Sequence, residues 1–119
     1  MERSVMMLGA VIVAFGLSGG FLPASAAAPD PATISAAKTP ADHEAIAKAY
    51  EEEAASLDKL AARHKDLGET YGQPGGKLWQ AGQSKHCLSV ANELAAAARN
   101  ERALAAEHRK MAKDAGKSL

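Results

Sequence analysis

The four histidines and the single cysteine of the chain are the side chains best suited to chemistry. Imidazole, thiolate and thioether groups are ligands that select copper and zinc over magnesium and calcium. The candidate metal ligands are His43, His64, His86, Cys87, His108 and Met111. His108 and Met111 are three residues apart, so they share one face of a helix. With His43 they make a set of two nitrogens and one sulfur that suits copper.

His64, His86 and Cys87 form a second candidate set, for copper or zinc. The alternative for both sets is purely structural. In that interpretation the histidines lie at the ends of a helical bundle, and Cys87 is a small buried residue. The sequence leaves two functions open: a protein that binds copper or zinc, and a structural or protein-interaction module without a ligand.

Catalysis finds little support in the sequence. Cys87 follows His86 directly, but no third group is positioned to orient a nucleophile and its base. Glu53 and Glu101 lack the histidine three residues on that a di-metal carboxylate site in a bundle requires. The motifs of serine hydrolases, zinc proteases and phosphate-binding loops are missing as well. We therefore expect a protein that is not an enzyme, with no catalytic residues.

Two heptad series position the candidate ligands on two helices. The first series is His43, Ile46, Tyr50, Glu53, Leu57, Leu60, His64 and Leu67, and the second is Cys87, Val90, Leu94, Ala97, Glu101, Leu104, His108 and Met111. Alanines at seven-residue spacing flank both series and allow the helices to approach closely. The stretch AARHKDL in the first helix aligns with AAEHRKM in the second, so the helices resemble two copies of one unit.

The predicted fold is an all-α, antiparallel two-helix hairpin of the coiled-coil type. Thr39 is a good helix cap before Pro40, Gly68 is a natural end for the first helix, and Ser84 can cap the second. The expected order is a signal peptide at 1–26, a flexible linker at 27–38, a hairpin at 39–116 with helices at 40–67 and 84–114 joined by a loop at 68–83, and a tail at 117–119.

Antiparallel packing groups the candidate ligands by the two ends of the hairpin. It brings His43 near His108 and Met111 at one end, and His64 near Cys87 at the other. His86 is adjacent to that second end. The same packing lets Glu53 and Glu101 approach each other in the middle, where a pair of carboxyl groups would help to fix the register.

The first 26 residues have the layout of a cleavable secretory signal peptide. Arg3 precedes an apolar run at 5–17, and the small residues at 24–26 form a cleavage site. We expect export to the periplasm of a bacterium or secretion, with no membrane segment after cleavage. Disulfides persist in such a compartment, so the unpaired Cys87 can bridge two chains, bind a ligand or stay buried as a thiol.

The charge balance and the composition limit the classes of partner. The 14 Lys and Arg residues equal the 14 Asp and Glu residues, which argues against a nucleic-acid binder. Aromatic residues make up only 4% of the chain, and much of its apolar content is alanine, so the core is thin. A lone hairpin of this kind would be marginally stable. We expect it to self-associate into a four-helix bundle or to pack against another helical protein.

The segment 39–114 resembles small exported bacterial proteins that are rich in alanine. Their helices carry His or Cys near the start and a histidine later, and they end in motifs such as AEHRKMA, found here at 106–112. The resemblance implies a helical hairpin in an exported protein. It implies no catalytic residue and no settled activity.

Overall fold

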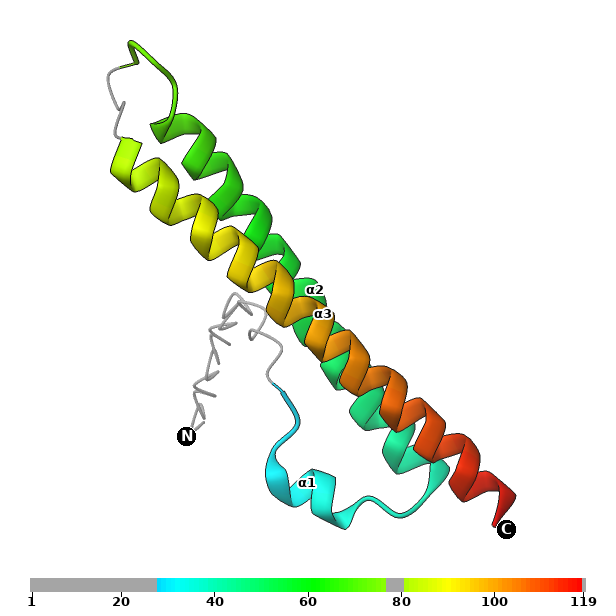
Figure 1. Cartoon of the computed structure of the whole chain (residues 1–119). Coiled ribbons are helices and arrows are strands. Elements are labelled where there is room, and N and C mark those ends of the chain that lie inside the picture. The colour runs from blue at the N-terminus through cyan, green and yellow to red at the C-terminus, as the bar shows by residue number, and fades with distance from the viewer. Residues whose placement is uncertain (1–27, 77–80, 119) are drawn as a thin grey trace, which may run out of the picture.

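The chain folds as an all-α hairpin in a computed structural model that describes residues 28–76 and 81–118. A short helix, α1 (Pro31–Ala36), precedes two long ones, α2 (Pro40–Tyr71) and α3 (Ala81–Lys117). The long helices lie antiparallel along each other, and α1 lies beside them near the start of α2 (Figure 1). The predicted hairpin is confirmed. The expected signal peptide lies outside the described residues.

Helix α2 begins at the predicted cap. The Thr39 hydroxyl accepts a hydrogen bond from the Asp42 amide at 3.1 Å, and the Asp42 carboxylate accepts one from the Thr39 amide at 2.9 Å. This reciprocal pair is a capping box, and it satisfies amides that the first helical turn leaves free. Backbone hydrogen bonds from Lys38 and Thr39 lower the pKa of the Asp42 carboxyl.

The predicted end of the first helix at residue 67 is wrong. Helix α2 passes through Gly68 and ends at Tyr71, with Gly72 as its cap. Gly68 serves close packing instead: a Cβ there would lie 2.8 Å from Cγ of Leu88 on α3. A glycine that admits a neighbouring helix and a glycine that ends a helix look the same in sequence.

The predicted start of the second helix at Ser84 is also wrong. Helix α3 begins at Ala81, so Ser84 lies inside it, and the helix continues to Lys117 rather than ending at 114. The Ser84 hydroxyl donates a hydrogen bond of 2.7 Å to the carbonyl oxygen of Gly68. It therefore joins the two helices instead of capping one. The connection is confined to 72–80, shorter than the predicted loop at 68–83.

The two long helices meet along rows of small residues. The buried rows, each with seven-residue spacing, are Ala47, Ala54, Ala61 and Gly68 on α2, and Ala91, Ala98, Ala105 and Ala112 on α3. The heptad series placed leucines at the centre of the contact between the two helices (the seam). This is wrong in part, because Leu60 and Met111 of those series are each 44% exposed. Because only a methyl group stands between the helices, their axes come close and the longer neighbouring side chains are left at the rims.

Residues 27–38 were expected to form a flexible linker, but this segment contains α1. Asp30 caps the helix by accepting a hydrogen bond of 2.9 Å from the Thr33 amide, and Pro31 occupies the first turn. From this segment Ile34 and Ala37 pack against a core cluster at one end of the hairpin. The members of that cluster are Ile46, Ala47, Tyr50 and Ala105.

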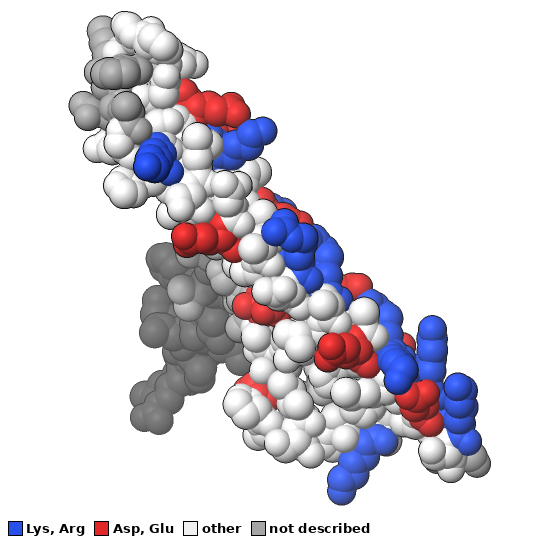
Figure 2. All heavy atoms as spheres, in the orientation of Figure 1, with Lys and Arg blue, Asp and Glu red and all other residues white. Residues whose placement is uncertain are grey.

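One rim of the hairpin is charged. Arg109 of α3 pairs with Glu51 and with Glu44 of α2, and Arg102 pairs with Asp58. Lys, Arg, Asp and Glu side chains are spread along one edge of the molecule (Figure 2). Such exposed pairs contribute little stability individually, about 0–1 kcal/mol each. Across 28–76 and 81–118, neither long helix is sufficiently apolar over its length to span a membrane.

Candidate functional site

Two of the predicted metal ligands meet across the hairpin. The Nδ1 atoms of His43 on α2 and His108 on α3 are 3.2 Å apart. Their ring centroids are 5.4 Å apart and the rings are tilted by 32°. When both rings are neutral, one Nδ1 carries a hydrogen and donates a hydrogen bond to the other Nδ1. The tautomers of the two rings decide which residue is the donor. The predicted approach of His43 to His108 is confirmed.

His108 is the more enclosed member of this histidine pair. Its side chain is 7% exposed, and the ring of Tyr50 lies 5.8 Å away, centroid to centroid. Burial lowers the pKa of His108, and the neighbouring charge of His43 lowers it further, while Glu107 acts in the opposite direction. The ring is therefore held in the neutral form, which is the form that binds a metal.

The separation of the two Nδ1 atoms fits a shared metal ion. Two imidazole nitrogens bound tetrahedrally to one zinc-sized ion are about 3.3 Å apart. The observed 3.2 Å is close to this distance. The separation of these two atoms is therefore compatible with a shared proton and with a shared cation.

Met111 lies one helical turn beyond His108, as the spacing predicted. Its side chain is exposed rather than packed in the seam. A methionine side chain has three rotatable bonds, so an exposed one can reposition its sulfur at small cost. The histidine pair is thus fixed by packing, whereas Met111 is free to move.

The other predicted ligands lie toward the loop end of the hairpin. His64 is three heptads after His43 on α2, and Cys87 is three heptads before His108 on α3, so antiparallel packing places them at equivalent levels. Both are half-buried, and Nδ1 of His64 is buried without a hydrogen-bond partner among the residues that the structure describes. His86 is exposed.

Among residues 28–76 and 81–118, no three His, Cys, Asp or Glu side chains gather closely enough to hold a metal ion together. The histidine pair supplies two ligands. Among the described residues, Met111 is the candidate for a further ligand at that end.

A pair of carboxyl groups lies midway along the hairpin. The carboxyl groups of Glu53 and Glu101 lie close enough to interact, and within the described residues the Oε2 atom of each is buried without a hydrogen-bond partner. Burial raises the pKa of Glu101, and the neighbouring carboxyl group of Glu53 raises it further. The predicted approach of these two residues is confirmed. Protonation of one carboxyl group removes the repulsion between the two.

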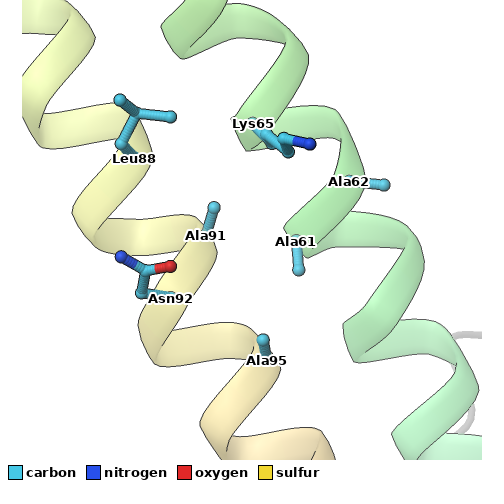
Figure 3. A pocket seen from close by; sticks show the side chains of 7 residues that line it. All are labelled: Ala61, Ala62, Lys65, Leu88, Ala91, Asn92 and Ala95. Atoms are coloured by element: carbon cyan, nitrogen blue, oxygen red, sulfur yellow. The ribbon is translucent and has the colours of Figure 1, made fainter.

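A shallow hollow of about 350 Å³ opens between the long helices toward the loop end. Alanines from both helices lie between the backbones there, with Leu88 and Lys65 near its rim (Figure 3). The residues that line the hollow are Ala61, Ala62, Lys65, Leu88, Ala91, Asn92 and Ala95. The heptad series did not reveal this hollow, although its signal was present in the run of alanines at these positions.

Comparisons of this chain with protein-family models, with curated proteins and with solved structures find no match. Functional assignment therefore depends on the chemistry of the side chains that the two helices bring together.

Proposed function

We propose that this chain binds a transition-metal ion, copper or zinc, between His43 and His108. The observation that carries the proposal is the 3.2 Å separation of their Nδ1 atoms, close to the spacing of two imidazole ligands on one ion. Burial of His108 supports it, because a neutral ring need not lose a second proton before it can coordinate.

Met111 favours copper at this end of the hairpin. Thioether sulfur is a soft ligand, which suits Cu(I) better than zinc. Met111 is one turn from His108 and its side chain is exposed, so rotation of its own bonds can bring the sulfur toward the histidine pair. The resulting set is two nitrogens and one sulfur, with any remaining position open to solvent or to a partner.

A second and weaker site is proposed at the loop end. His64 and Cys87 lie opposite each other at the loop end, as His43 and His108 do at the other end. Metal binding at the buried Nδ1 of His64 would break no hydrogen bond among the described residues. The exposed His86 is next to Cys87 and can contribute from the surface. A thiolate and an imidazole together suit either copper or zinc.

Export fits this role. With residues 1–26 as a cleaved signal peptide, the hairpin would act in the bacterial periplasm or outside the cell. A carrier or buffer of metal ions in that compartment needs exchangeable ligands rather than a closed cage, and at this end of the hairpin Met111 is exposed and His43 is half-buried. We assign no catalytic step to these residues.

Titration of the purified protein with Cu(I), Cu(II) and Zn(II), followed by calorimetry, tests the proposal. We expect binding at about micromolar affinity or tighter. The substitutions His43→Ala and His108→Ala remove the first site. His86→Ala is the comparison: it removes a ligand of the second proposed site, at the opposite end of the hairpin, and should leave the affinity of the first site unchanged. Affinity weaker than micromolar, or equal affinity in all three variants, would contradict the proposal.

A second candidate function is a helical interaction module. It is favoured by one observation: large apolar side chains on the rim opposite the ion pairs remain 36–44% exposed. A four-helix bundle, formed with another copy or with a different helical protein, would cover them. Crosslinking in the exported fraction, followed by identification of the captured chain, separates these two partners.

A further inference from the structure

One rim of the hairpin carries an apolar face that no other described segment covers. Its members are Leu60 and Leu67 on α2, and Val90, Leu104 and Met111 on α3, all 36–44% exposed. Each directly precedes a small residue of the buried rows, so each lies about 100° around its helix from the seam. In an antiparallel pair, residues displaced in this way from both helices project to the same side.

At one end of the hairpin, the segment around α1 covers this side. Ile46 belongs to the same row of α2 as Leu60 and Leu67, and it is only 2% exposed. Ile34 and Ala37, from the segment around α1, pack against the cluster that contains it. Leu60 and Leu67 continue the row without such a cover. The apolar face is therefore the continuation of a core that α1 completes at one end only.

We propose that a second copy of this chain covers the apolar face, so that two hairpins form a four-helix bundle. Beyond the part that the α1 segment covers, from the level of Tyr50 to Leu67, the face is about 25 Å long at the rise of an α-helix and about 18 Å across two helices. This is roughly 450 Å² in projection, of the same order as the roughly 800 Å² of accessible surface that each partner buries in a stable complex.

Charge favours a second copy over an unrelated helix. Arg63 of α2 and Glu93 of α3 flank the apolar face on its two outer edges. Neither makes an ion pair within the part of the chain that is described. They lie within about one helical turn of the same level. A twofold axis parallel to the hairpin lays α2 of one copy over α3 of the other, which brings Arg63 opposite Glu93 twice.

The carboxyl pair defines the middle of the proposed interface. Glu53 belongs to the row of Leu60 and Leu67, and its carboxyl group lies beside that of Glu101. A polar pair within an apolar interface disfavours registers that bury it against leucine, so it selects among possible alignments. The two hairpins are expected to align their carboxyl pairs at one level, which is the level set by the parallel twofold axis.

The proposal is tested by sedimentation equilibrium of the protein as purified from cells. A reductant is present to prevent disulfide bridges through Cys87. We expect twice the mass of one chain, and we expect Leu60→Lys to weaken association about 30-fold or more. Leu88→Lys is the matched control: Leu88 is 38% exposed but lines the hollow on the other side. It should leave the mass unchanged. Circular dichroism confirms that both variants are folded.

A monomer at all accessible concentrations, or equal dissociation by Leu60→Lys and Leu88→Lys, would overturn the second copy as occupant. The arrangement has its own test. Arg63→Glu should weaken the dimer, and adding Glu93→Arg should restore it. If the single reversal leaves the dissociation constant unchanged, the parallel twofold axis is wrong.

Discussion

Ser84 and Gly68 are joined by a hydrogen bond of 2.7 Å from the Ser84 hydroxyl to the Gly68 carbonyl oxygen. The same carbonyl accepts a bond from the amide of Gly72, which closes the last turn of α2. The end of one helix and the beginning of the next are thus joined through a single acceptor. This contact sets the alignment of α2 with α3, and it depends on the absence of a side chain at residue 68.

The substitution Gly68→Ala tests this dependence. Alanine is favoured over glycine in a helix by about 1 kcal/mol, but the new Cβ would lie 2.8 Å from Cγ of Leu88. Overpacking of this kind costs about 1–3 kcal/mol, so we expect a net loss of stability in urea unfolding. Gly82→Ala is the control, because a Cβ there meets nothing within 4 Å. It should stabilise the protein by about 0.5 kcal/mol. Equal effects at the two positions would contradict the tight contact.

The alanine rows give a second prediction. Ala98 is fully buried between the helices. Ala98→Leu should force the helix axes apart and lower the free energy of unfolding by about 1–3 kcal/mol. Ala103→Leu, at an exposed position of the same helix, should have almost no effect. Thermal unfolding followed by circular dichroism measures both. An unchanged midpoint for Ala98→Leu would mean that the helices are not closely packed there.

Heptad spacing was enough to predict the hairpin and the approach of His43 to His108, and the order Thr39–Pro40 predicted the helix cap. It could not decide which row lies at the centre. Leu60 and Ala61 are neighbours in sequence, and both rows repeat every seven residues. The choice between them depends on how close the helix axes come, a property of the packed pair. The sequence predicted a helix end at Gly68 for a similar reason: the role of this glycine depends on Leu88, which lies on the other helix.

The carboxyl pair predicts a specific dependence of stability on pH. Burial and Glu53 raise the pKa of Glu101 above its usual value of 4.5. As pH rises, Glu101 therefore loses its proton at a higher pH in the folded chain than in the unfolded chain. The stability contributed by this group is fully present below pH 4.5 and is lost as pH rises through the raised pKa. Glu101→Gln should remove that loss, leaving stability near pH 4 unchanged and increasing it by about 1 kcal/mol near pH 7.

Urea unfolding at the two pH values measures this difference. Asp66→Asn serves as the control, because Asp66 is exposed and its side chain makes no ion pair within the described ranges. If both variants change the free energy of unfolding by the same amount at both pH values, the interaction between Glu53 and Glu101 does not cause the pH dependence.

The histidine pair predicts that acid and metal act on stability in opposite directions. Burial lowers the pKa of His108 below 6.5, so the unfolded chain takes up a proton first as pH falls. The metal-free protein should therefore lose stability as pH falls from 6.5 through the lowered pKa. At pH 7, a metal at about 100 times its dissociation constant should add about 2.7 kcal/mol. This gain should vanish on acidification, because a protonated ring cannot coordinate. Unfolding with and without Cu(I) or Zn(II) should show both effects in Cys87→Ser, which lacks the thiolate of the second proposed site, and neither effect in the double variant that also carries His108→Gln. A metal-dependent gain of undiminished size in the double variant would contradict a metal site at His43 and His108.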